Sequence, residues 1–213
     1  MNGGLVDSAT QIDAPDDRRI YGVAAAQVIA NCDETNQGRV QVRLTWLPGY
    51  EPWARLALLD RGIYFIPQKG DEVLVAFSHG DIREPYIVGQ LWNGLDHPPA
   101  RTQGDPINKR VIRTRKDHEI AFDDQTKSIT ITSVDKHQIE IKESQIKITM
   151  AEDKASVTLS STGDVTIKSS SRISLEAETI SIKGTKVCIT GETSVEVDGK
   201  TQCSIKGAQI FIG

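Results

Sequence analysis

The chain has 213 residues, of which 38% are hydrophobic and 25% are charged, and its formal net charge is −4 at pH 7. This length suffices for one ordinary domain and a smaller or elongated second part. The mild acidity and the lack of a lysine- or arginine-rich tract argue against nucleic acid and anionic membrane as primary partners. No stretch is long and apolar enough to span a bilayer.

The first 19 residues are polar and lack the basic start and apolar core of a signal peptide. We therefore expect residues 1–19 to be a flexible segment and the protein to be assembled in the cytoplasm. The three cysteines, Cys32, Cys188 and Cys203, have no metal-ligand spacing and cannot all pair within one chain. Reduced thiols are the simplest interpretation.

Residues 20–94 predict a small all-β domain. Runs with the alternation or composition of strands are separated by turn-forming sequences, and no convincing amphipathic helix interrupts them. The runs cover residues 20–32, 38–47, 53–59, 72–78 and 85–94. Five short strands in this length favour a closed barrel of the OB type, because closure removes exposed sheet edges.

The composition changes sharply after the predicted barrel. All eight prolines lie at or before Pro106, and all three tryptophans and four tyrosines lie before residue 93. Residues 95–110 are rich in proline and charge, so we assign 95–117 to a linker. Residues 118–213 then form a repeat built mainly from Ile, Val, Thr, Ser, Lys and Glu.

The repeat consists of apolar residues two positions apart, with polar residues between them. Successive side chains of a strand point to opposite faces, so each pair marks one buried face only two residues deep. The twelve pairs are Ile120/Phe122, Ile129/Ile131, Ile139/Ile141, Ile146/Ile148, Val157/Leu159, Val165/Ile167, Ile173/Leu175, Ile180/Ile182, Val187/Ile189, Val195/Val197, Cys203/Ile205 and Ile210/Ile212. Glycines and Ser/Asp clusters are expected to turn the chain between pairs.

A strand with two inward residues cannot build a core alone. Either one chain coils so that three strands form each rung, or three identical chains wrap around a shared axis. The single-strand period and the uniformly narrow strands favour the three-chain prism, in which all the pairs from Ile120/Phe122 to Cys203/Ile205 form the trimer core. At about 4.8 Å of rise per strand, twelve strands give a rod of roughly 60 Å.

The residues also resemble a known family. The order P-x-x-GDEVLVAF, GD, PYIVG and NG over residues 67–94, after GRVQVRLTWLPG and followed by the repeat, is similar to the central spike of contractile injection machines. This family includes phage baseplate assembly protein V and the spike region of VgrG proteins. The resemblance implies an all-β chain with an OB barrel followed by an intertwined trimeric β-helix, placed on the axis of a baseplate.

The departures from the family suggest partners. The chain has no room for the large hub domain of VgrG proteins, so we expect a separate hub protein. Within the barrel loops, the contact residues expected for that hub are Pro48, Tyr50, Arg61 and Tyr64. The chain also lacks the His-x-His pair with which some phage spikes bind iron. We therefore expect a PAAR-type tip protein to bind Ile210, Phe211, Ile212 and Gly213.

The expected function is mechanical: a spike that links the hub to the tip and pierces the target membrane. We expect no catalytic site, metal or cofactor. Asp123 and Asp124 are adjacent and should face opposite ways, and His79 has no partner at a suggestive spacing. Two alternatives stay open, a trimeric tailspike that binds polysaccharide and an OB domain that binds single-stranded nucleic acid through residues such as Trp46, Trp53 and Tyr64.

Overall fold

Five strands near the N-terminal end close into a barrel with the order β1-β2-β3-β5-β4, in which β4 pairs back onto β1. The computed structural model describes residues 19–100 and 107–211. The barrel strands are β1 Val23–Ala30, β2 Val40–Leu44, β3 Trp53–Leu56, β4 Glu72–Phe77 and β5 Pro85–Leu91. The all-β class and the closed five-stranded barrel predicted from the sequence are confirmed.

The barrel has a true hydrophobic core, made by the inward residues of its alternating strands. In β2, for example, Val40, Val42 and Leu44 are buried, while Gln41 and Arg43 between them are not. The buried residues are Ala26, Val28, Val40, Val42, Leu44, Ala54, Val73, Val75, Phe77, Ile82 and Ile87. Full burial of such aliphatic side chains stabilises a domain by about 1.5–3 kcal/mol each, so the barrel has the core of an independent domain.

The chain enters the barrel through a close backbone contact with the turn after β4. This turn contains the short 3₁₀ segment Ser78–Gly80, and the N–H of Ile20 donates to the carbonyl of Gly80 at 2.8 Å. Gly80 has a φ of +81°, and a Cβ there would lie 3.1 Å from the Ile20 nitrogen. Glycine tolerates this positive φ and has no Cβ to crowd Ile20, so Gly80 allows the chain before β1 to pack against this turn.

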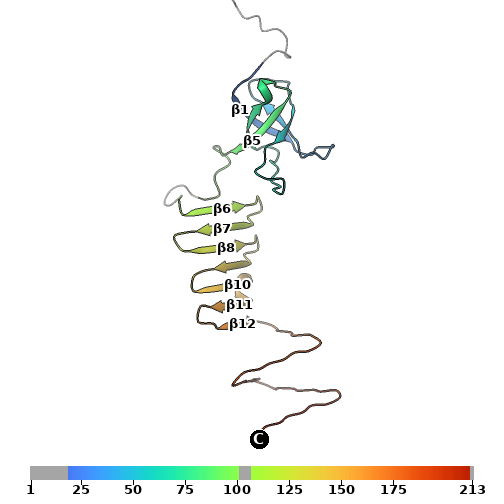
Figure 1. Cartoon of the computed structure of the whole chain (residues 1–213), viewed down its shortest axis with the longest axis vertical. Helices are drawn as coiled ribbons and strands as arrows, with labels where there is room; N and C mark the ends of the chain where they lie inside the picture. The colour runs from blue at the N-terminus through green and yellow to red at the C-terminus, as the bar shows by residue number, and fades with distance from the viewer. Residues whose placement is uncertain (1–18, 101–106, 212–213) are drawn as a thin grey trace, which may run out of the picture.

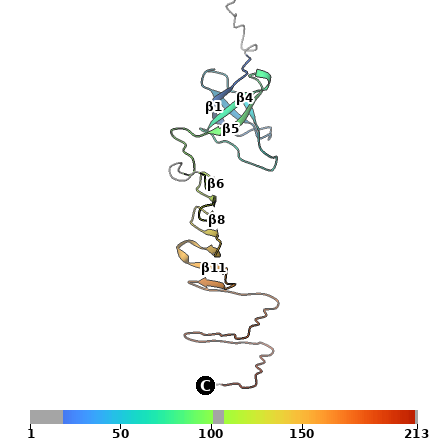
Figure 2. The ribbon, with the colours of Figure 1, turned by 60° about the vertical axis from the view of Figure 1, so that its left-hand side comes forward.

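A second sheet of seven antiparallel strands follows, in which the strands lie in chain order. Its strands are β6 Lys109–Arg113, β7 Glu119–Asp123, β8 Ser128–Thr132, β9 Gln138–Ile141, β10 Gln145–Thr149, β11 Ala155–Ser160 and β12 Val165–Ser169. The sheet starts inside the range predicted as a linker, because β6 lies within residues 95–117. Figures 1 and 2 show the barrel at one end of the molecule, with the seven strands stacked below it along the long axis.

The turns of this sheet explain why its strands pair within one chain. Asp117, Lys127 and Lys136 have φ between 50° and 64°, the left-handed conformation that reverses a chain tightly. The hydroxyls of Thr114 and Ser133 accept hydrogen bonds from the backbone N–H groups of the residues four positions later. Within one chain, β6–β12 therefore form a self-paired antiparallel meander.

Residues 172–211, the C-terminal segment, have a different structure. The segment runs as an extended zigzag below the sheet (Figure 1), and no strand is assigned within it. Six of the twelve predicted pairs thus lie in β7–β12, and the other six lie in or run past the described part of this segment. The predicted flexible stretch 1–19 falls outside the described residues except for Arg19, which bridges to Asp81.

Candidate assembly surface

The predicted inward residues of the sheet form two continuous columns on one face, here called the apolar columns. In strand pairing, Ile120 lies opposite Ile131 and Phe122 opposite Ile129, and the same alignment recurs at every following pair. One column contains Phe122, Ile129, Ile141, Ile146, Leu159 and Val165. The other contains Ile112, Ile120, Ile131, Ile139, Ile148, Val157 and Ile167.

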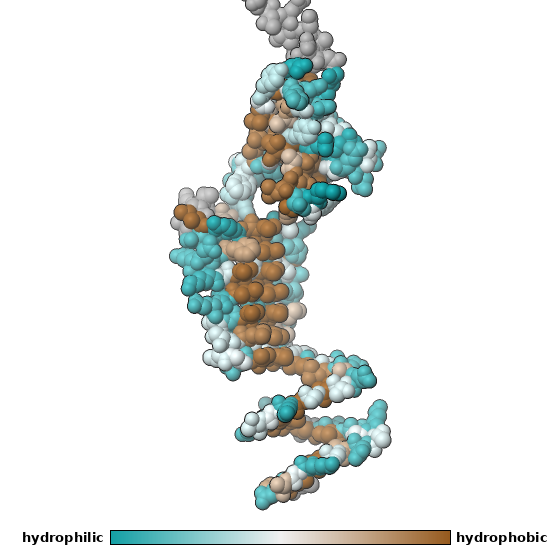
Figure 3. Space-filling model, viewed as in Figure 1, coloured by the Kyte–Doolittle hydropathy of each residue, from teal (hydrophilic) through white to brown (hydrophobic). Residues whose placement is uncertain are grey.

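The apolar columns are not buried within one chain. Apart from half-buried Val157, their members are between 37% and 64% exposed, whereas no hydrophobic core residue of the barrel exceeds 8%. Figure 3 shows them as an unbroken hydrophobic stripe over the stacked strands. A contiguous apolar surface of this length marks a protein–protein interface in a water-exposed protein. The residues predicted to point inward thus share one face of the sheet, and this face lacks a cover in the single chain.

The opposite face of the sheet is polar and carries several ion pairs. Lys142 lies 2.7 Å from Glu140, Lys109 lies 3.8 Å from Asp123, and Arg113 pairs with Glu119. Exposed pairs of this kind contribute little stability each. They instead distinguish the two faces: the face with these pairs is polar, and the other carries an apolar side chain at every column position except Arg110.

The first strand of the sheet was missed because its pair is mixed. β6 places Arg110 and Ile112 at the positions that hold two apolar residues in the later strands. The Arg110 guanidinium donates to the carbonyl of Ile107 at 2.8 Å and lies 3.3 Å from Asp124. An arginine at this position hid the strand from a search for apolar pairs, although the Arg-x-Ile spacing carried the same period.

Two histidines connect successive turns along one edge of the sheet. The Nδ1 of His118 accepts from the N–H of Val134 at 3.3 Å, and the Nδ1 of His137 accepts from the N–H of Ala151 at 3.0 Å. Both histidines occupy the same place in their turns, nineteen residues apart. The repeated Thr/Ser-x-x-x-His pattern could have indicated this role, which is to hold the turns at a fixed spacing.

In the C-terminal segment, neither side chains nor backbone are covered within the chain. Between residues 172 and 211 the described residues make no backbone hydrogen bond to their own chain. The predicted core residues there are all exposed: Ile173, Leu175, Ile180, Ile182, Val187, Ile189, Val195, Val197, Cys203 and Ile205. Unpaired backbone groups are costly wherever water is excluded. Burial of these side chains in an assembly thus requires backbone partners from other chains.

The corners of this segment need glycine for steric reasons. A Cβ on Gly191 would lie 2.2 Å from the carbonyl oxygen of Ser194, and a Cβ on Gly199 would lie 2.4 Å from that of Gln202. Such distances are far below van der Waals contact, so no other residue fits this path. The glycines predicted to turn the chain therefore permit close backbone approach at these two corners.

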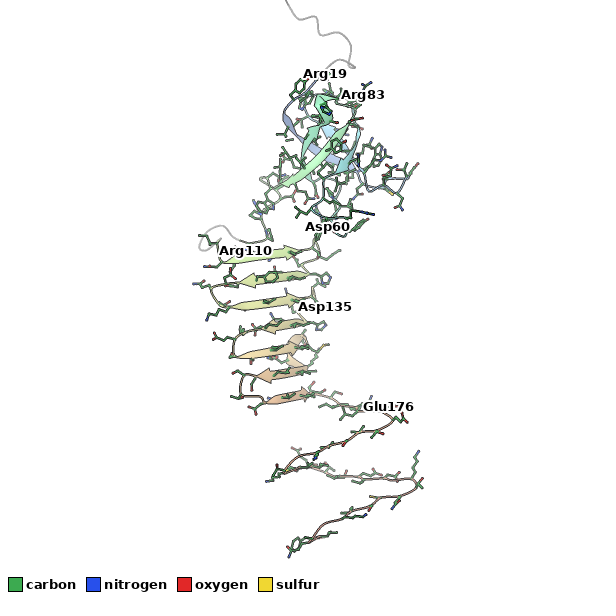
Figure 4. The ribbon with its side chains drawn as sticks, in the orientation of Figure 1. Arg19, Asp60, Arg83, Arg110, Asp135 and Glu176 are labelled. Carbon is green, nitrogen blue, oxygen red and sulfur yellow. The ribbon has the colours of Figure 1, made fainter. Side chains whose placement is uncertain are left out.

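The four predicted hub contacts do not form one surface. The hydroxyl of Tyr50 donates to the carbonyl of Ile82 at 3.1 Å, which ties the loop of Pro48 and Tyr50 to the end of the barrel that carries Arg83. Arg61 and Tyr64 belong to the loop of Asp60. Figure 4 shows Asp60 at the opposite end, next to the sheet, while Arg19 and Arg83 lie far from it.

The predicted tip residues are described only in part. Ile210 is half-exposed and Phe211 is 89% exposed at the end of the segment, while Ile212 and Gly213 lie outside the described residues.

Two carboxylates of the chain, Asp123 and Asp81, accept hydrogen bonds within turns. The N–H of Thr126 and other donors keep the pKa of Asp123 below its ordinary value, and the Arg83 guanidinium lowers the pKa of Asp81.

Within residues 19–100 and 107–211, no three His, Cys, Asp or Glu side chains come together as a metal site requires. In the same ranges, no helix has the length and apolarity needed to cross a membrane.

Residues 24–92, nearly the whole barrel, match the type VI secretion system/phage-baseplate injector OB domain family. The chain resembles the central spike proteins of contractile injection systems. The match covers the strands that close the barrel and stops before the seven-stranded sheet. The family match thus covers the barrel and does not include the seven-stranded sheet or the C-terminal segment.

Curated relatives extend the similarity into the sheet. The actin cross-linking toxin VgrG1 of Vibrio cholerae is 31% identical over 130 residues, which is 54% of this chain and 11% of the relative. The type VI secretion system spike protein VgrG2a of Pseudomonas aeruginosa is 27% identical over 141 residues, or 60% and 16%. VgrG3 of Vibrio cholerae, also a spike protein, is 30% identical over 134 residues, or 55% and 13%. The chain spans well under a fifth of the length of these relatives.

Proposed function

We propose that this chain is the central spike of a contractile injection machine of the phage-tail or type VI secretion kind, and that it acts as a homotrimer. The observation that carries the proposal is the pair of apolar columns, one running through six strands and the other through seven, which stay exposed in one chain. The injector-type barrel and the spike relatives support the same function.

Three copies give the columns a cover. The strands of the sheet are only four to six residues long, so three such sheets can close into a narrow triangular prism. Each copy then fills one third of the interior with its two columns, and its charged face stays in water. Burial of each Ile or Val on the axis contributes roughly 1.5–3 kcal/mol, repeated three times at every level.

The C-terminal segments of the three copies wind around the same axis below the prism. Each segment receives its backbone hydrogen bonds from the other two, which answers the lack of partners within the chain. Because wound chains must unwind before they separate, dissociation is slow. The product is a stiff needle without a catalytic role, able to pierce a membrane under mechanical force.

The two ends of this needle contact different partners. A separate hub protein binds the barrel end that carries Arg83. The loop of Pro48 and Tyr50 is tied to that end, so these two residues are kept as contacts. Arg61 and Tyr64 belong to the loop at the other end, so they are not. A PAAR-type tip protein covers the last rung at residues 210–213, where apolar side chains meet water. The assembled machine forms in the cytoplasm and carries the spike in its baseplate.

Electron microscopy of the purified full chain, with matched charge variants, tests this proposal. The wild type should show a three-fold particle with a broad head and a thin shaft. Ile148→Lys places a charge in an apolar column and should abolish the particle, whereas Thr149→Lys on the polar face should preserve it. Monomeric particles in the wild type, or equal behaviour of the two variants, would overturn the proposal.

The end assignments need binding experiments of their own. A hub protein should be retained by residues 1–106 and lost with Tyr50→Ala, but kept with Tyr64→Ala. Deletion of residues 208–213 should abolish binding of the tip protein and leave the trimer intact. Hub retention by residues 107–213 alone, or full tip affinity after the deletion, would reverse these assignments.

A further inference from the structure

The loop between β3 and β4, here called the collar loop (residues 57–66), exposes large apolar side chains. Leu59 is 98% exposed, Tyr64 83% and Phe65 62%. Both ends of the loop are fixed to the barrel: the N–H of Ala57 donates to the carbonyl of Ile87 at 2.9 Å, and Ile66 packs against the hydrophobic core. The loop thus presents its apolar tip from a rigid base.

The tip of the collar loop is itself ordered by a turn. The Oδ1 of Asp60 accepts from the N–H of Gly62 at 2.7 Å, and the carbonyl of Asp60 accepts from the N–H of Ile63 at 3.2 Å. A built turn that displays leucine and aromatic side chains to water is expensive unless something covers it. This points to a binding surface.

The collar loop lies at the junction between barrel and sheet. Figure 4 places Asp60 beside the start of the sheet, away from Arg19 and Arg83. Arg115, in the first turn of the sheet, pairs with Asp71 of the barrel, which holds the two parts together at this height. The chain that crosses the junction is also apolar and exposed, at Trp92, Leu95 and Ile107.

The chain's own sheet does not cover the collar loop, since Leu59 is almost fully exposed although the sheet lies next to it. The hydrophobic surface is, however, continuous with the apolar columns: Figure 3 shows hydrophobic residues on the lower part of the barrel directly above the stripe. Whatever covers the columns is therefore also adjacent to the loop.

We propose that the collar loop docks on a second copy of this chain, against the apolar junction residues between its barrel and its sheet. This inference rests on the proposed trimer, which brings a neighbouring junction to the same level. The three loops then form a ring that seals the barrel-side end of the shaft core. They also link each barrel to the sheet of a neighbouring copy. Axial force is then not carried only by the segment that joins barrel and sheet within one chain.

Site-specific photo-cross-linking of the full chain tests the contact. p-Benzoylphenylalanine replaces Phe65, which keeps an aromatic ring at the site, and in a control it replaces Glu34 on the exposed turn between β1 and β2. After irradiation, the Phe65 position should give covalent dimers, with cross-links mapped to residues 92–112 of another copy. The Glu34 position should give none at those residues.

Light scattering before irradiation tests the trimer separately from the contact of the collar loop. A wild-type chain that is not trimeric refutes the proposed function. A trimer whose Phe65 position gives only cross-links within one copy, or none, refutes the collar alone. As a second measurement, L59S/F65S should keep the trimer mass but increase proteolysis between residues 92 and 108 several-fold relative to Lys69→Ser. Unchanged proteolysis would likewise overturn the collar.

Discussion

The seven-stranded sheet and the C-terminal segment share one sequence pattern but differ in what a single chain satisfies. In the sheet, every strand pairs with its neighbours along the chain, while the side chains of the apolar columns lack a cover. In the C-terminal segment, the described residues lack both side-chain cover and backbone partners from their own chain. One part can fold before it assembles, whereas the other must fold as it assembles.

The difference lies in the turns. Five of the six turns of the sheet contain a residue with positive φ, and the turn Lys142–Gln145 reverses the chain without one. After Gly163 no described residue has a positive φ, and at Gly191 and Gly199 the backbone approaches itself closely. The pattern of apolar pairs sets which side chains share a face, and the turns of the sheet allow its strands to pair within one chain.

The largest effect is expected from a charge in the C-terminal segment. Ile182→Lys brings three ammonium groups together on a dry axis, and buried unpaired charges are costly enough to prevent assembly. Ser181→Lys adds the same charge at the neighbouring outward position and should leave the trimer intact. Light scattering of both variants makes the comparison. If Ile182→Lys assembled as readily as Ser181→Lys, the assigned inward face would be wrong.

The unassembled Ile182→Lys chain also sharpens the contrast between the two regions. In hydrogen exchange, amides of residues 172–211 should exchange within the dead time, because no bond within the chain protects them. Amides of β8, β9 and β10 should remain measurably protected by their ladder. In the wild-type trimer both regions should be slow. Equal protection of both regions in the variant would contradict the claim that only the sheet is hydrogen-bonded within one chain.

A smaller effect is expected from truncation within the sheet. Ile131→Ala should cost roughly 2–5 kcal/mol per copy when the apolar columns are covered in the assembly, as core truncations do. Thr130→Ala, on the polar face next to it, should change stability by about 0.5 kcal/mol or less. Thermal unfolding of the two assembled variants checks this. Similar unfolding temperatures would mean that the columns are not buried.

The smallest effect should occur in the barrel, which has its own core. Asp33 shapes the turn after β1 by accepting from Arg39 and Thr35, and the Arg39 guanidinium holds its pKa far below the ordinary value of 3.8. A carboxylate with a lowered pKa stabilises the folded state above that ordinary value, and this contribution is lost as the pH falls below it.

Asp33→Asn should therefore lower the barrel's melting temperature slightly at pH 7 and have less effect near pH 2. Calorimetry at both pH values, with Glu34→Gln as the control, measures the difference. The melting temperature of the part after the barrel, residues 107–213, should not change. A larger loss at pH 2 than at pH 7 would contradict the assigned ion pair.

Much of this architecture could be read from the sequence. The barrel strands were predictable because their alternation matches a half-buried face, as in Val40, Val42 and Leu44. The alignment of the apolar pairs on one face of β7–β12 was predictable for the same reason, and the strand register follows these pairs.

Other features escaped because they depend on single residues or on distant contacts. β6 was hidden by Arg110 in an apolar column, and the change in pairing depends on the turn conformation of residues such as Asp117, which periodicity does not encode. The separation of Tyr50 from Tyr64 depends on the hydrogen bond to Ile82, across 32 residues. The sequence pattern alone gave no distance between these loops.

The mass of the purified full chain in solution is the most direct test of the central claim, that the apolar columns and the C-terminal segment are covered by two further copies of this chain. Light scattering at micromolar concentration should give three times the chain mass of 23.4 kDa. The value should persist on dilution, because wound chains separate slowly. A mass of one or two chains would contradict the account.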